Sequence, residues 1–143
     1  MEEKKILMVD DENMIIDLYR EAFSQTGYSV RTAGSAEEAL EILKNERIWV
    51  MFLDLNLPGM TGVELCRKIR KEWPMTIAYA VTGYASLFEL SDCRDAGFED
   101  YFTKPTKLQE LQDAAEYAFK KLSRWKTKGQ GKKAQKESDD WGM

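Results

Sequence analysis

Five residues whose side chains could handle a phosphoryl group stand at the ends of short apolar runs. They are Asp10, Asp11, Asp54, Thr82 and Lys104. Buried parallel strands read as apolar runs, and ligands of open α/β sheets gather outside the carboxyl ends of the strands. The spacing therefore predicts that three carboxylates, a hydroxyl and an ammonium group meet at one edge of a sheet.

The carboxylates define the chemistry that such an edge could perform. Asp54 follows five apolar residues, and a buried aspartate is costly unless it is paired, hydrogen-bonded or bound to a metal. Three clustered carboxylates repel one another, so a cation is needed, and an all-oxygen site suits Mg²⁺. We expect the Asp54 carboxylate to attack a phosphorus centre, while Mg²⁺ and Lys104 stabilise its oxygens.

Taken singly, these residues also have plainer interpretations. Asp10 and Asp11 could cap the helix that follows them, since carboxylates favour the first turn of a helix. Lys104 could be a surface lysine before the turn residue Pro105, although an Xaa-Pro bond is also a candidate cis peptide. Thr82 could be an ordinary β-branched strand residue. Only the combination favours a functional site.

Apolar and helical patterns alternate five times along the chain. The expected strands span residues 5–10, 28–33, 49–54, 76–82 and 99–103. The expected helices span residues 13–26, 35–46, 61–72, 85–96 and 107–126. Repeated strand–helix units imply parallel strands joined by right-handed crossovers, so we predict an α/β sheet with helices on both faces.

The charge is distributed unevenly. Residues 1–120 hold 14 basic and 22 acidic residues, whereas residues 121–143 hold 7 and 3. An acidic body argues against nucleic-acid binding by the folded part. We divide the chain into a domain at 1–123 and a flexible basic tail or linker at 124–143, where Gly, Lys, Gln and Ser accumulate after Lys128.

Several other classes of site are excluded by composition. The chain has no histidine and only two distant cysteines, Cys66 and Cys93, which excludes a zinc site and argues against a hydrolytic triad. The cysteines are expected to be reduced thiols. No apolar stretch has the length of a signal-peptide core or a membrane span, so we expect a cytoplasmic protein without a membrane partner.

Five motifs in order resemble the receiver domain of two-component response regulators, including the chemotaxis regulators. The similarity covers about residues 4–122 and depends on VDD at 9–11, DLNLPGMTG at 54–62, VTG at 81–83, AG at 96–97 and YFTKP at 101–105. The resemblance implies a flavodoxin-like (βα)5 three-layer sandwich with a five-stranded parallel sheet of order 2-1-3-4-5. It also implies a phosphorelay role rather than enzymatic turnover.

The resemblance implies roles for individual residues. Asp54 would be the phosphoacceptor, supplied by a histidine kinase or a phosphotransfer protein. Asp11 and Asp54 would bind Mg²⁺ through their side chains, Asp10 through water and Asn56 through its backbone carbonyl.

The remaining implied roles concern signalling. Lys104 would contact the phosphoryl group, Thr82 would be the switch hydroxyl, and Tyr101 would be the aromatic switch residue. The output surface would combine residues 85–96, 99–103 and 107–126, and it is also the expected surface of a homodimer. At most, slow self-phosphorylation from small donors and self-dephosphorylation are expected.

Three functions compete at this point. The chain could be a stand-alone receiver that signals by protein contact or passes a phosphoryl group along a relay. It could instead be the receiver part of a larger regulator whose output domain is absent from this sequence. An aspartyl phosphatase is the third, but that chemistry commonly uses a second acid two residues after the nucleophile, where this chain has Asn56.

Overall fold

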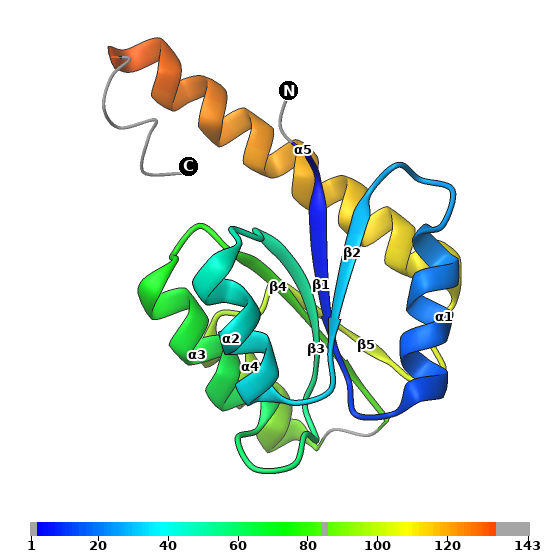
Figure 1. Cartoon of the computed structure of the whole chain (residues 1–143). Helices are drawn as coiled ribbons and strands as arrows, with labels where there is room; N and C mark the ends of the chain where they lie inside the picture. Colours follow the sequence, from blue (N-terminus) through cyan, green and yellow to red (C-terminus); the bar gives the residue numbers. More distant parts are fainter. Residues whose placement is uncertain (1–2, 84–85, 134–143) are drawn as a thin grey trace.

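The computed structural model describes residues 3–83 and 86–133 and shows ten elements that alternate strand and helix (Figure 1). The strands are β1 Lys5–Val9, β2 Ser29–Ala33, β3 Val50–Asp54, β4 Ile77–Thr82 and β5 Asp100–Thr103. The helices are α1 Asn13–Phe23, α2 Ala36–Asn45, α3 Gly62–Glu72, α4 Leu87–Ala96 and α5 Leu108–Lys133. All ten predicted elements are present, although α1 ends at Phe23, three residues before its predicted end.

The strands form one parallel sheet in the order β2-β1-β3-β4-β5. The apolar runs of β1, β3 and β4 are buried throughout, as expected for central strands covered on both faces. The prediction of a three-layer sandwich with this strand order is therefore confirmed.

Alternate strand residues face two separate cores, because successive side chains of a strand point to opposite faces of the sheet. Leu7 and Leu53 pack with α2, α3 and α4, whereas Met8 and Phe52 pack with α1 and α5. Figure 1 shows these two groups of helices on opposite sides of the sheet. Each strand is thereby held from both faces, which fixes the position of its carboxyl end.

Two helices begin with complete capping boxes. Thr61 and Glu64 exchange side-chain and backbone hydrogen bonds at the start of α3, and Ser86 and Glu89 do the same at the start of α4. Each box satisfies two backbone N–H groups that the helix leaves unpaired. The boxes therefore fix the first turns of α3 and α4.

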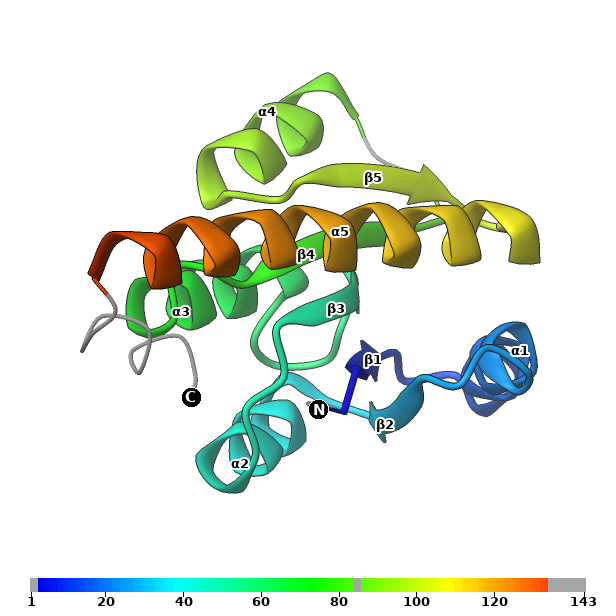
Figure 2. The ribbon, with the colours of Figure 1, turned by 90° about the horizontal axis from the view of Figure 1, so that it is seen from above.

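The last helix continues further than predicted. We expected it to end near residue 126 and a flexible tail to follow Lys128, but α5 extends to Lys133. Residues 120–128 consist mostly of good helix formers, which allows the helix to propagate beyond its packed part. Figure 2 shows α5 running alongside β5. Residues 134–143, the rest of the predicted tail, lie outside the described residues, and the division at residue 123 stays a prediction.

Within the described part of the chain, no helix is both long and apolar enough to cross a membrane.

Candidate functional site

The predicted site residues come from strands that are neighbours in the sheet. Asp10 directly follows β1, and Asp54 is the last residue of β3, with Val9 opposite Leu53 in the register. Thr82 ends β4 and pairs with Thr103 of β5, the residue before Lys104. The parallel register therefore places these side chains at one edge, as the sequence predicted.

Three carboxylates meet at this edge. One oxygen from each of Asp10, Asp11 and Asp54 lies within 4.8 Å of the others. Asp10 and Asp54 are 1% and 4% exposed, whereas Asp11 is exposed. Two carboxylates of the cluster are thus buried, and the third is exposed to solvent, so a ligand can approach the cluster from the side of Asp11.

Backbone amides orient the two buried carboxylates. Asp10 Oδ1 accepts a hydrogen bond from the Glu12 N–H at 2.9 Å, and Asp54 Oδ1 accepts one from the Asn56 N–H at 3.1 Å. Each bond uses one oxygen and leaves the other, Oδ2, in contact with Lys104 Nζ. Asn56 thus helps to position Asp54, and the role of its carbonyl as a metal ligand stays a prediction.

Lys104 supplies the positive charge of the site. Its Nζ lies 2.8 Å from Asp10 Oδ2, 3.4 Å from Asp54 Oδ2 and 3.5 Å from Glu12 Oε1. The Lys104 side chain is only 15% exposed. Its peptide bond to Pro105 is cis, which was one of the two interpretations that the sequence allowed. Lys104 is therefore an interior counter-charge rather than the surface lysine of the alternative interpretation.

Burial and charge shift two ionisable groups of the site. Burial raises the pKa of Asp10 above its ordinary value and outweighs the lowering by Lys104, while the charge of Asp54 raises it further. The pKa of Lys104 is also raised, because its hydrogen bond to Asp10 and the charges of Asp10 and Asp54 outweigh the effect of burial. One lysine therefore does not neutralise the cluster fully.

The donor set fits a hard divalent cation. Asp10 Oδ2 is buried, and within the described part of the chain it contacts a single donor, the Lys104 ammonium at 2.8 Å. The available ligand atoms are all oxygens, which suits Mg²⁺ better than softer metals. A buried carboxylate oxygen that has only a lysine beside it, in a cluster of excess negative charge, is a suitable ligand for such an ion.

Thr82 and Tyr101 occupy different environments. Thr82 is 1% exposed, and its carbonyl accepts a hydrogen bond from the Lys104 N–H at 2.7 Å, so it belongs to the same edge as Lys104. Tyr101 lies on β5, is 45% exposed and lines a groove with Leu90 and Cys93 of α4. Tyr101 is therefore outside the carboxylate cluster.

Two residues of the site were not singled out by the sequence analysis. Glu12 contacts Lys104, but in the sequence it is one acid among many. Gly62 lies so close to Asp54 that a Cβ there would be 2.1 Å from the Asp54 carbonyl oxygen. Only glycine allows this approach of α3 to β3. In the sequence, Gly62 is the last residue of the DLNLPGMTG motif at 54–62, and the motif does not reveal this contact.

Comparison of the sequence with known proteins agrees with the fold and with the aspartate cluster. The family model for the response regulator receiver domain matches residues 6–116. The alkaline phosphatase synthesis transcriptional regulatory protein PhoP of Bacillus subtilis is 35% identical over 108 residues, which cover 76% of this chain and 45% of PhoP. Sporulation initiation phosphotransferase F of the same organism is 32% identical over 114 residues, which cover 80% of this chain and 92% of that protein.

Solved structures agree with this result. A CheY-like response regulator receiver domain protein from Methanospirillum hungatei has a TM-score of 0.77 and 33% identity, covering 84% of this chain and 99% of that one. The BeF3-activated receiver domain of DrrB has a TM-score of 0.76 and 29% identity, covering 83% and 99%.

The relatives differ in how much of their length this chain matches. The chain spans less than half of PhoP and of the response regulator MprA of a Mycobacterium, at 45% and 46%. It nevertheless carries the complete receiver fold and the aspartate cluster at the carboxyl edge of the sheet. On the family match and the fold together, this chain belongs to the receiver domains of two-component response regulators.

Proposed function

We propose that Asp54 accepts a phosphoryl group from the phosphohistidine of a histidine kinase or a phosphotransfer protein. The observation that carries the proposal is the position of Asp54: its Oδ1 is held by the Asn56 N–H, and its Oδ2 faces Lys104 within the carboxylate cluster. An Asp54 oxygen attacks phosphorus, a P–O bond forms, and the P–N bond to the donor histidine breaks. The histidine leaves with the electron pair, and Asp54 becomes an acyl phosphate.

The surrounding residues prepare this transfer. Asp10, Asp11 and Asp54 would hold Mg²⁺, with the Asn56 carbonyl as a further oxygen ligand. When bound, the ion supplies positive charge that stabilises the phosphoryl oxygens. Lys104 supplies a second positive charge from within the protein, since its ammonium group already lies between Asp10 and Asp54.

The proposed signal is a charge change at Asp54. Phosphorylation replaces a charge of −1 by about −1.5 to −2 and adds three acceptor oxygens. Thr82 would donate a hydrogen bond to the new group, and Tyr101 would change its exposure on β5. These changes bias two states of the surface formed by α4, β5 and α5, where a downstream partner or a second copy would bind.

Receiver domains are phosphoacceptors rather than conventional enzymes. Slow self-phosphorylation from small donors, self-dephosphorylation and a cytoplasmic location belong to this proposal. The short match to PhoP supports a variant of it, in which this chain is the receiver part of a regulator with a separate output domain. The near-complete match to sporulation initiation phosphotransferase F supports a stand-alone relay protein.

The intact mass of the protein after incubation with acetyl phosphate and Mg²⁺ tests the proposal. We expect one added phosphoryl group, which is absent in EDTA and in the Asp54→Ala variant. Asp95→Ala, an exposed aspartate of α4, is the matched control and should be modified like the parent protein.

Fast hydrolysis of the acyl phosphate could hide the adduct, so beryllofluoride serves as a second probe. Binding of beryllofluoride that requires Asp54 and Mg²⁺ would support the proposal without a stable adduct. A folded protein that neither gains mass nor binds beryllofluoride would overturn it.

A further inference from the structure

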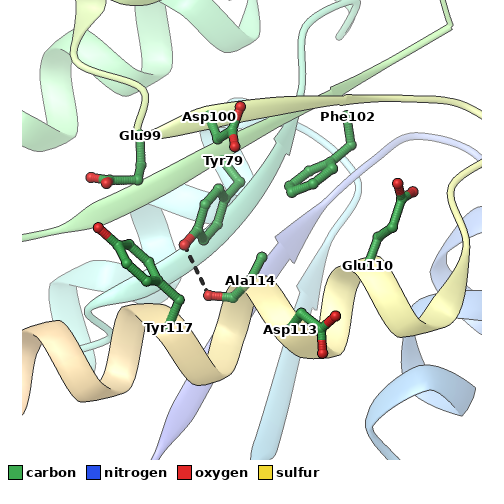
Figure 3. Close-up of a pocket in the computed structure, with 8 residues that line it drawn as sticks. All are labelled: Tyr79, Glu99, Asp100, Phe102, Glu110, Asp113, Ala114 and Tyr117. Atoms are coloured by element: carbon green, nitrogen blue, oxygen red, sulfur yellow. Dashed lines mark hydrogen bonds between the residues drawn. The ribbon is translucent and has the colours of Figure 1, made fainter.

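A groove of about 400 Å³ lies between β5 and α5 (Figure 3), and its lining residues include none of the aspartate cluster. Its floor is formed by Tyr79, Phe102 and Ala114, and the ring of Tyr117 forms one wall. Four carboxylates surround this apolar surface, two near β5 and two on α5: Glu99, Asp100, Glu110 and Asp113. An apolar floor within an acidic rim differs from both the polar aspartate site and an ordinary solvated surface.

The floor presents carbon rather than polar atoms. The Tyr79 hydroxyl donates a hydrogen bond to the Ala114 carbonyl at 2.8 Å, as Figure 3 shows. The rings of Tyr79 and Phe102 are 5.7 Å apart between centroids. The Tyr79 hydroxyl is thus already engaged within the protein, and the aromatic rings are what this floor offers to an incoming group.

The rim carries more negative charge than the protein neutralises. Within the described ranges, the only salt bridge to these carboxylates joins Lys121 Nζ to Glu99 at 3.1 Å. The other three carboxylates, Asp100, Glu110 and Asp113, have no ion pair with any described residue. Burial, and then the charge of Glu99, raise the pKa of the Tyr79 phenol, in agreement with a negative potential over the floor.

This combination selects a particular side chain. An arginine has an apolar stem that fits a hydrophobic floor and a planar guanidinium that stacks on aromatic rings. The guanidinium also forms paired hydrogen bonds with carboxylates. A phosphate or another anion would be repelled by the rim, and a purely apolar group would leave the carboxylates without a counter-charge.

The position of the groove favours a protein segment as its occupant. The groove opens beside β5, the edge strand of the sheet, and β5 and α5 belong to the output surface of the proposed function. We propose that this groove binds a segment of a partner protein that carries an arginine next to an apolar side chain. The inference rests on the proposed function only in placing the groove on the output surface.

A peptide titration tests the groove directly. The probe is acetyl-Ala-Leu-Arg-Leu-Ala amide, and its control has citrulline in place of arginine, which keeps the shape and removes the charge. Amide correlation spectra of the whole chain are recorded with saturating Mg²⁺, so that the aspartate cluster is occupied. We expect shifts confined to residues 99–102 and 110–117, and about tenfold weaker binding of the citrulline peptide.

Variants of the rim sharpen the test. The double variant Asp100→Asn/Asp113→Asn should bind the arginine peptide about tenfold more weakly. Glu116→Gln is the matched control, because Glu116 carries the same charge on α5 but does not line the groove. Its affinity should stay within about twofold of the parent protein, as expected for an exposed charge.

Three outcomes would overturn the inference. The two peptides could bind equally, the shifts could lie at the aspartate cluster, or the Asp100→Asn/Asp113→Asn variant could lose a dimer seen by sedimentation in the parent protein. The last would assign the groove to the basic segment of a second copy. The mass test on the same samples separates the two proposals: a phosphorylated protein without peptide binding contradicts the groove alone.

Discussion

The two acidic regions of this molecule handle negative charge in opposite ways. At the carboxyl edge of the sheet, Asp10 and Asp54 are buried, and Lys104 is built in between them. Around the β5–α5 groove, Asp113 and its neighbours are exposed to water, and only Glu99 has a lysine partner in the described structure.

The difference follows from the cost of burying a charge. A carboxylate removed from water requires a counter-charge in the folded protein, whereas an exposed carboxylate is stabilised by solvent. The buried cluster therefore needs a positive charge within the folded protein, which Lys104 supplies. The exposed rim needs none, so a binding partner can supply the positive charge there. The same residue type is a structural liability in one region and nearly neutral in the other.

Lys104→Met should give the largest change in stability. Removing the ammonium leaves buried carboxylates without their partner, so we expect the free energy of unfolding in EDTA to fall by about 2–3 kcal/mol at pH 7. The pKa of Lys104 is raised in the folded state. The stability that Lys104 contributes is therefore complete below about pH 10.4, the ordinary pKa of lysine, and it is lost only as the pH rises through the folded-state pKa. Urea denaturation measures the change.

Mg²⁺ and a second lysine provide the controls. Saturating Mg²⁺ should reduce the loss in Lys104→Met, because the ion replaces part of the missing positive charge. Lys121→Met removes the lysine that pairs with Glu99, and we expect a loss of at most about 0.5 kcal/mol there. Equal losses in the two variants would contradict the contrast between the regions.

Asp10→Asn should act in the opposite direction. It removes one charge from the crowded cluster and keeps an oxygen for the Glu12 N–H, so we expect a gain of about 1 kcal/mol in EDTA. The pKa of Asp10 is raised, so its ionised form costs stability above the folded-state pKa, and this cost disappears below about 3.9, the unfolded value. Urea denaturation at pH 7 and at lower pH should show the gain shrinking.

The metal dependence of this variant is a further check. Mg²⁺ should stabilise the parent protein more than Asp10→Asn, since binding to the folded state adds to its stability. The gain seen in EDTA should then disappear. A loss of stability for Asp10→Asn in EDTA would contradict the view that the cluster carries excess negative charge.

The grouping of the site residues could be predicted from the sequence, because their positions depend on where the strands end. Asp10, Asp54 and Lys104 each follow an apolar run, and parallel strands bring their carboxyl ends to one edge regardless of the details of packing. The contact between Gly62 and Asp54 was not predictable in this way, because it depends on the angle at which α3 approaches β3.

The β5–α5 groove and the length of α5 were not predicted from the sequence, for different reasons. In the sequence, Asp100 and Asp113 are two acids among many, and only the packing of α5 beside β5 brings them around Tyr79. The end of α5 was misplaced because the apolar residues at helical spacing stop at Trp125, whereas the helical backbone continues to Lys133 through Gly129 and Gly131, both poor helix formers.

Asp113→Asn should give the smallest change. Asp113 is exposed and accepts a hydrogen bond from Gln109 at 2.8 Å, which asparagine can also accept, so we expect a change of at most about 0.5 kcal/mol in the free energy of unfolding. Any gain from reduced repulsion with its neighbours should decrease at high salt, because exposed charges are screened. Glu116→Gln in the same urea titrations is the control. A loss above about 1 kcal/mol for Asp113→Asn alone would show that this carboxylate holds α5 against β5, and the rim would then be structural like the buried cluster.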